Sequence, residues 1–186
     1  AFAMVERMPA TYEDLKPGMV IGSYRVEAGL GRGGMGTVYS ATHTLLPRRA
    51  AIKVMHPELC LSPGMASRVV QEAAILEDLR HPGLVRVFEC NLLPDHRPYI
   101  IMNLIEGETL TARIGDPGRL PWTEVAAPMA AVSDVHTSLH TPGVVHPNLK
   151  PDNLLHTKPD PDLPHPDSDG GVPRLILDRA LTALGH

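Results

Sequence analysis

Segments of β-type residues alternate with glycine-rich and other turn residues over residues 20–56 of the chain. The stretches "SYRVEAGL", "TVYSATH" and "AAIKVM" have β-type composition, and glycine-rich or Pro-Arg-Arg turns separate them. This pattern predicts an antiparallel meander over residues 20–56. The segments 84–92 and 98–105 predict two further strands, joined across Pro94-Asp95. We therefore expect a sheet of five antiparallel strands.

Two other segments have helical spacing. Residues 63–80 carry apolar side chains at three- and four-residue steps, with Ser62 as the N-cap and His81-Pro82 as the stop. A second helix is predicted over 122–140, and an interior proline at Pro128 predicts a kink or a late helix start there. Its apolar face comprises Val125, Met129, Val132 and Leu139.

The composition changes after Gly107, which divides the chain. We expect an N-terminal tail over 1–15, part of it an expression scar, a small lobe over 16–105 and a second lobe over 106–186. Residues 157–171 are rich in Pro, Asp and Gly. Such a segment buries too little apolar surface to order itself, so we expect a mobile loop.

Charge and cysteine content exclude several classes of protein. The chain has 17 Lys and Arg against 21 Asp and Glu, a net charge of -4, so no basic field would hold nucleic acid. Cys60 and Cys90 are too few for a disulfide framework or a four-ligand zinc site. No apolar run approaches the roughly 20 residues of a membrane helix, and no signal-peptide pattern is present. We expect a cytoplasmic protein without a membrane or nucleic-acid partner.

The stretch "GRGGMGTV" spaces Gly31, Gly33 and Gly36 as G-x-G-x-x-G-x-V. This spacing lets a β-turn-β backbone approach phosphates closely enough to donate its N–H groups. On this motif alone, a glycine-rich hairpin without a ligand remains an alternative.

Lys53 and Glu72 form a second candidate feature. Lys53 ends a strand, and Glu72 lies on the apolar face of the first predicted helix. A carboxylate turned toward a core needs a partner, and Lys53 is the cation expected on the facing sheet. Alternatively, Glu72 sits at the edge of the apolar stripe and reaches water.

Taken in order, these pieces resemble the eukaryotic-like Ser/Thr protein kinases, particularly the bacterial branch with "LGRGGMGTVY". The resemblance runs from about Gly22 to Leu181, because "HPGLVRVFE", "PYIIMNLIEGETL" and "GVVHPNLKPDNLL" match the later strands, the hinge and the catalytic loop. It implies an α+β, protein-kinase-like fold: a five-stranded antiparallel N-lobe with an αC helix, plus an incomplete helical C-lobe.

The resemblance also implies an ATP site, with Met102 as gatekeeper and residues 103–105 along the adenine edge. The residues it assigns to the nucleotide are Gly31, Gly33, Gly36, Val38, Ala51, Lys53, Glu72, Met102, Leu104 and Leu155. It assigns magnesium to Asn153 and Asp178. However, Arg179 stands where the family has the Phe of Asp-Phe-Gly, and it can pair with Asp178 instead. "LDRAL" is alternatively an unrelated apolar segment, so ATP and Mg²⁺ binding stay open.

The catalytic loop departs from the family pattern. His146, Pro147 and Asn148 replace His-Arg-Asp, whereas Lys150, implied to contact the γ-phosphate, is retained. An Asn amide has no useful basicity, and losing a general base slows a reaction by ~10²–10⁴-fold. Asn148 alone does not exclude slow activity, because phosphoryl transfer has a loose transition state.

The chain stops at His186, before any activation segment. Positioning a second substrate supplies ~7–11 kcal/mol of a barrier. We therefore expect a catalytically inactive pseudokinase, acting as a protein-binding or regulatory module. The alternatives are a nucleotide sensor and a low-activity ATP-dependent kinase that phosphorylates itself or hydrolyses ATP. Because the apolar face of 122–140 lacks its usual cover, we expect a homodimer or a protein partner on the second lobe, or an excerpt from a longer protein.

Overall fold

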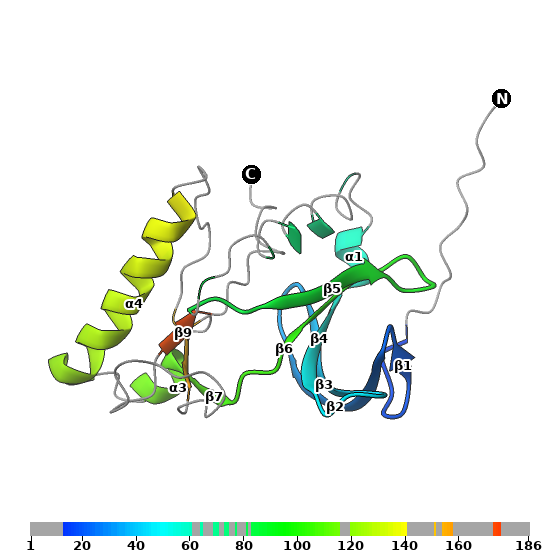
Figure 1. Cartoon of the computed structure of the whole chain (residues 1–186), viewed down its shortest axis with the longest axis horizontal. Coiled ribbons are helices and arrows are strands. Elements are labelled where there is room, and N and C mark those ends of the chain that lie inside the picture. The colour runs from blue at the N-terminus through cyan, green and yellow to red at the C-terminus, as the bar shows by residue number, and fades with distance from the viewer. Residues whose placement is uncertain are drawn as a thin grey trace.

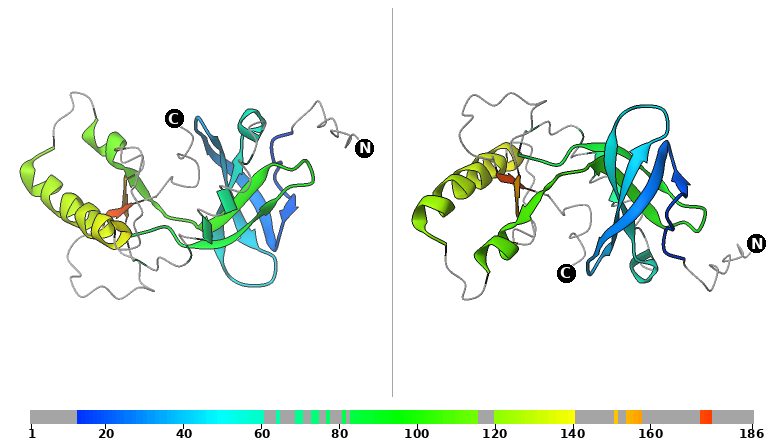
Figure 2. Two further views of the ribbon diagram at one scale, coloured as in Figure 1. Left: turned by 90° about the horizontal axis from the view of Figure 1, so that it is seen from above. Right: turned by 90° about the horizontal axis from the view of Figure 1, so that it is seen from below.

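The computed structural model describes residues 13–60, 64, 69–70, 73–74, 77, 81, 83–115, 120–140, 151, 154–157 and 173–175. These residues form two parts (Figure 1). One part is a six-stranded sheet, and the other holds a three-stranded sheet with the long helix α4. Both views of Figure 2 place α4 and the small sheet together, on the side away from the N-terminus.

The large sheet is antiparallel throughout, with strand order β1-β2-β3-β4-β6-β5. The strands are β1 (Val20–Ile21), β2 (Tyr24–Arg32), β3 (Gly36–His43), β4 (Arg49–Met55), β5 (Val87–Leu92) and β6 (Pro98–Asn103). All five predicted strands are confirmed. β1 is an addition, and its two residues are too few to show a period.

Side chains alternate between the two faces of this sheet, and each face carries a core cluster. The first cluster includes Tyr24, Val26, Tyr39, Ala41, Ile52, Val54, Tyr99 and Ile101. The second includes Met55, Val69, Ala73, Leu84, Val87, Ile100, Val132, Val135 and Leu154. Because the second cluster contains residues of α4 and of the small sheet, it joins the two parts of the molecule.

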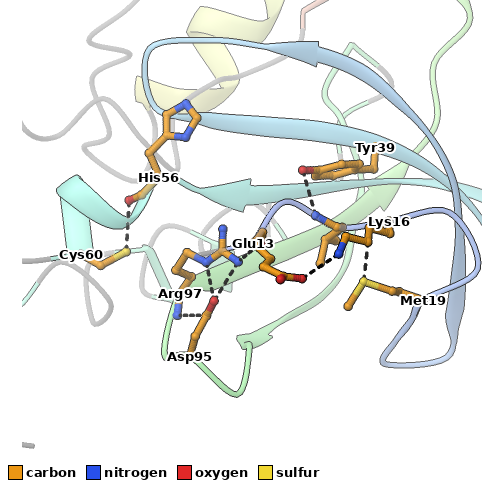
Figure 3. A network of polar contacts seen from close by, with 9 residues as sticks. Glu13, Lys16, Met19, Tyr39, His56, Cys60, Asp95 and Arg97 are labelled. Carbon is orange, nitrogen blue, oxygen red and sulfur yellow. Dashed lines mark hydrogen bonds and ion pairs between the residues drawn. The ribbon is translucent and has the colours of Figure 1, made fainter. Parts of the chain in front are cut away.

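The segment before β1 packs against the large sheet (Figure 3). Leu15 is buried in the first cluster, and its N–H donates to the hydroxyl of Tyr39 at 3.2 Å. Arg97 Nη2 donates to the carbonyl oxygen of Glu13 at 2.7 Å. Residues 13–15, which the sequence assigned to a tail, are therefore part of the folded lobe, and residues 1–12 lie outside the described ranges.

A short helix, α1 (Pro57–Cys60), follows β4 directly. The longer helix predicted over 63–80 is described at only a few positions. The residues of this segment that the structure describes as helical are Val69, Val70, Ala73, Ala74 and Glu77. Val69 and Ala73 are buried in the second cluster, as a helix packed on this face of the sheet requires.

The second part begins with β7 (Gly107–Thr109) and α3 (Leu110–Ile114), followed by α4 (Trp122–His140), β8 (Leu154–Thr157) and β9 (Pro173–Leu175). β8 is the central strand and pairs antiparallel with both neighbours. The side chain of Thr109 caps α3 by accepting from the N–H of Ala112 at 3.1 Å. Thr157 belongs to β8 rather than to the predicted loop, whose residues 158–171 lie outside the described ranges.

α4 begins and ends at the residues predicted for this helix, 122 and 140. The alternative of a late start at Pro128 is therefore wrong. Val132 and Val135 of α4 are buried against Leu84 and Leu154 of the same chain. This part of its apolar face therefore has an internal cover, although Met129 is 39% exposed. Among the described helices, none is long and apolar enough to cross a membrane.

Candidate nucleotide-binding site

The glycine-rich motif forms the hairpin between β2 and β3. Gly31 lies opposite Val38, and Arg32 lies opposite Thr37. The N–H of Gly33 donates to the carbonyl oxygen of Gly36 at 2.9 Å and closes the turn. The hairpin thus extends beyond the last paired residues as an exposed glycine-rich tip.

The three motif glycines are required for different reasons. A Cβ added at Gly36 would collide with the carbonyl oxygen of Val54, so the packing of β3 on β4 excludes any side chain there. A Cβ at Gly31 would meet nothing within 4 Å, and one at Gly33 would meet only the oxygen of Gly36 at 3.9 Å. Neither glycine has a positive φ. The fold needs a glycine at position 36 but accepts a side chain at 31 or 33.

Four of the predicted site residues share one face of the large sheet. Val38 lies opposite Lys53, and Ala51 lies opposite Met102. Since residues directly opposite point the same way, and Ala51 and Lys53 are two apart on β4, all four side chains lie on the face that carries Met55. Ala51 is buried, and the others are half-buried.

The geometry of this face suits an aromatic ring next to a phosphate chain. Val38, Ala51 and Met102 provide apolar surface, and Lys53 brings a cation to the strand that follows the glycine hairpin. An ammonium group binds phosphate as a point charge, and backbone N–H groups add directed hydrogen bonds.

The remaining described site residues lie further along the chain. Leu104 is half-buried in the connection from β6 to β7, between the two parts of the molecule. Leu155 is buried in β8, opposite Thr109, and therefore belongs to the small sheet. The sequence did not indicate that Leu155 lies in a different sheet from the other site residues, because Leu155 was assigned to the site only by resemblance.

Several predicted residues lie outside the described ranges. These are Glu72, His146, Pro147, Asn148, Lys150, Asn153, Asp178 and Arg179. The pair of Lys53 with Glu72, the catalytic loop and the magnesium ligands therefore stay predictions. Within the described part of the chain, no group of three or more His, Cys, Asp or Glu side chains could hold a metal ion.

Two contacts hold the connection between the parts, and the sequence did not predict either. Asn103 donates its N–H to the carbonyl of Arg86 at 3.0 Å and accepts the N–H of Arg86 on its side-chain oxygen at 2.8 Å. Arg49, at the start of β4, forms an ion pair with Glu106 at 2.7 Å. The two Asn103 bonds fix the start of the segment that contains Leu104, and the exposed pair of Arg49 with Glu106 lies at its end.

His56 is a further residue of the site that the sequence did not single out. Its ring Nε2 lies 2.8 Å from the carbonyl oxygen of Gly33, at the tip of the glycine hairpin. The two residues are 23 positions apart, and only the return of β4 alongside β3 brings them together. No local pattern in the sequence carries that information.

Residues 24–163 match the protein kinase domain family. The chain belongs to the protein kinase family. Over 143 residues it is 36% identical to the serine/threonine-protein kinase Pkn1 of Myxococcus xanthus, covering 77% of this chain and 20% of that protein. It is 34% identical over 165 residues to serine/threonine-protein kinase pkn2 of the same organism, covering 89% of this chain and 20% of the relative.

The fold is also that of a kinase domain. The crystal structure of the Mycobacterium tuberculosis PknI kinase domain superposes with a TM-score of 0.74 and 25% identity, covering 91% of this chain and 63% of that one. This likeness confirms the predicted α+β, protein-kinase-like class. The chain spans about a fifth of the length of the two Myxococcus relatives.

The kinase relatives contradict the expectation of an inactive pseudokinase. They are named serine/threonine-protein kinases, and the matching family is the protein kinase domain, so the comparisons point to an enzyme. The expectation gave too much weight to Asn148 and to the end of the sequence. A loose phosphoryl-transfer transition state depends mainly on positioning and charge stabilisation, and only weakly on a base.

Proposed function

We propose that this chain supplies the ATP site of a serine/threonine protein kinase with low activity, which transfers the γ-phosphoryl group of ATP to a protein hydroxyl, its own included. The observation that carries the proposal is that the fold does not require a glycine at position 31 or 33. Their φ values and surroundings allow a side chain, yet both are glycine, beside a sheet face that carries Lys53. A phosphate approaching the backbone closely explains this choice.

Each residue of the site has a role in this proposal. The glycine turn donates backbone N–H groups to the phosphates, and Lys53 adds a positive charge beside them. Val38, Ala51 and Met102 pack against the adenine, and Leu104 lies along its edge. Asn153 and Asp178 are the residues that would hold Mg²⁺, which neutralises the charge that develops on the phosphates.

Nucleotide binding is tested by thermal unfolding with and without ATP and Mg²⁺. At 100 times its Kd, a ligand that binds only the folded chain stabilises it by about 2.7 kcal/mol. We expect a clear rise in Tm with ATP, and a smaller rise for Gly33→Ala, in which the new methyl group occupies the space of a phosphate. Gly29→Ala is the matched control, because a Cβ at Gly29 also meets nothing within 4 Å but lies outside the motif.

Turnover is tested by magnesium-dependent ADP release and by transfer of the γ-phosphoryl group of ATP to the chain itself. Lys53→Ala is expected to abolish both. Lys16→Ala, which removes a lysine from an exposed pair with Glu13, is expected to leave both unchanged. An unchanged Tm in saturating ATP, or turnover that survives Lys53→Ala, would disprove the proposal.

A further inference from the structure

His56 contacts the glycine turn at two points. Its backbone N–H donates to the carbonyl oxygen of Met35 at 3.0 Å. Its ring Nε2 lies 2.8 Å from the carbonyl oxygen of Gly33. A carbonyl oxygen can only accept a hydrogen bond, so Nε2 must carry the proton and donate it. One residue at the end of β4 therefore binds two carbonyl groups of the same turn.

The backbone of His56 is itself fixed. Met55, the last residue of β4, is buried in the second core cluster. The carbonyl oxygen of His56 accepts from the N–H of Leu59 at 3.2 Å and from the thiol of Cys60 at 3.4 Å, both in α1. Figure 3 shows the bond of Cys60 to the carbonyl oxygen of His56, with the His56 ring pointing away from Cys60. The ring thus reaches the turn from a held position, which is what precise orientation of a flexible segment requires.

Holding the Gly33 carbonyl also orients the next N–H group. In a planar trans peptide, the C=O of one residue and the N–H of the next point in opposite directions. Because the oxygen of Gly33 faces His56, the N–H of Gly34 faces the other way. The N–H of Gly33 is already bonded to the oxygen of Gly36. Glycines rotate freely, so without this tether the peptide between Gly33 and Gly34 would sample other orientations.

We propose that His56 is a positioning residue for phosphate binding. Its Nε2–H bond to Gly33 holds the turn with the N–H of Gly34 presented to the phosphates of the nucleotide. This inference rests on the proposed ATP site and adds the residue that orients its phosphate-binding backbone. It predicts that His56 affects affinity for the phosphates and leaves affinity for the adenine and ribose unchanged.

The test compares the binding of ATP, ADP and adenosine to the wild-type chain, His56→Ala and His56→Gln by calorimetry. Loss of one hydrogen bond that orients the turn is expected to weaken ATP and ADP binding about tenfold. Adenosine, which lacks phosphates, should bind with unchanged affinity. His56→Gln retains a side-chain N–H donor and should recover most of the loss. Equal Tm values without ligand would show that all three chains are folded.

The outcomes separate this inference from the proposed function. If the wild-type chain binds neither ATP nor ADP, the ATP site and the role of His56 both fail. If wild-type and His56→Ala bind ATP equally, or if adenosine weakens as much as ATP, only the role of His56 fails. Should His56→Ala not fold, the wild-type chain still provides a test by NMR. The Nε2–H proton of His56 must then be observed and protected from exchange, and its absence overturns the inference.

Discussion

Arg97 donates a hydrogen bond from Nη2 to the carbonyl oxygen of Glu13, 84 positions earlier in the chain, at 2.7 Å. The same guanidinium binds the carboxylate of Asp95 at 2.8 Å, and Arg97 is only 6% exposed. A buried guanidinium thus ties the N-terminal segment to the turn between β5 and β6, and Leu15 packs into the first core cluster beside it.

Arg97→Ala is expected to lower the free energy of unfolding by about 2–4 kcal/mol, because it leaves Asp95 and the Glu13 carbonyl without this donor. The control is Lys16→Ala, which breaks a pair with Glu13 whose side chains are 69% and 74% exposed. That change should stay below about 1 kcal/mol. Urea denaturation measures both, and similar losses in the two variants would contradict the role of Arg97.

Gly36→Ala is expected to lower the free energy of unfolding by about 1–3 kcal/mol, since the added methyl group must displace the backbone at Val54. Gly31→Ala places a methyl group in open space and should change it by less than about 1 kcal/mol. Thermal unfolding without ligand distinguishes the two. Equal stability of both variants would show that β3 and β4 are not so closely packed.

The contact between Gly83 and α4 allows a double-mutant test. A Cβ at Gly83 would lie 2.7 Å from Cγ2 of Val135, so Gly83→Ala should cost about 1–3 kcal/mol. Val135→Ala removes that methyl group but leaves a cavity, at a similar cost. The double variant should lose less than the sum of the two. Strict additivity in urea denaturation would mean that the two parts do not meet at these residues.

The two thiols predict a loss of stability at alkaline pH. Burial raises the pKa of both Cys60 and Cys90. Above about pH 8.5, the ordinary pKa of a thiol, the unfolded chain releases protons that the folded chain still binds. The free energy of unfolding should therefore fall as the pH rises from about 7.5 to 9.5.

Replacing both cysteines by alanine should flatten this pH profile. Burial also raises the pKa of Tyr99, but a phenol titrates near pH 10 even when exposed, so it contributes little over this range. An equally steep decline in the double variant would assign the effect to other groups.

Asn148→Asp is expected to raise magnesium-dependent ADP release by no more than ~10²-fold, the low end of the effect of a general base, because a loose transition state depends only weakly on the base that Asp would place at the position the resemblance gives to the substrate hydroxyl. Asn91→Asp adds the same charge at an exposed position of β5 and should have no effect. A rate that does not change in Asn148→Asp would mean that residue 148 does not contact the reacting hydroxyl.

The sequence predicted the elements that have a clear period. Five strands have six to nine residues of β-type composition between turn residues, and the helix over 122–140 spans several turns. The missed elements are β1, α1, β7, α3, β8 and β9. They have two to five residues, which is too short for a period. Leu15 was missed because a single apolar residue in a polar segment gives no pattern.

The candidate site was predicted only as a set of positions. Alternation along the strands explains why Val38, Ala51, Lys53 and Met102 share a face, but their roles in binding stay predictions. The contact of His56 with Gly33 could not be predicted, since it depends on where two strand ends meet in space. The boundary between the two lobes, the ligands for magnesium and a protein partner or homodimer also stay predictions.

The strand that leads into the second part of the molecule is an interior strand of the large sheet. β6 lies between β4 and β5 and is hydrogen-bonded on both sides. An edge strand can separate from a sheet by breaking the hydrogen bonds on one side only. β6 would have to break its bonds to both β4 and β5, so movement of the second part does not detach it easily. Relative motion of the two parts would therefore be taken up by backbone rotations over residues 104–106, and not by detachment of β6 from the large sheet.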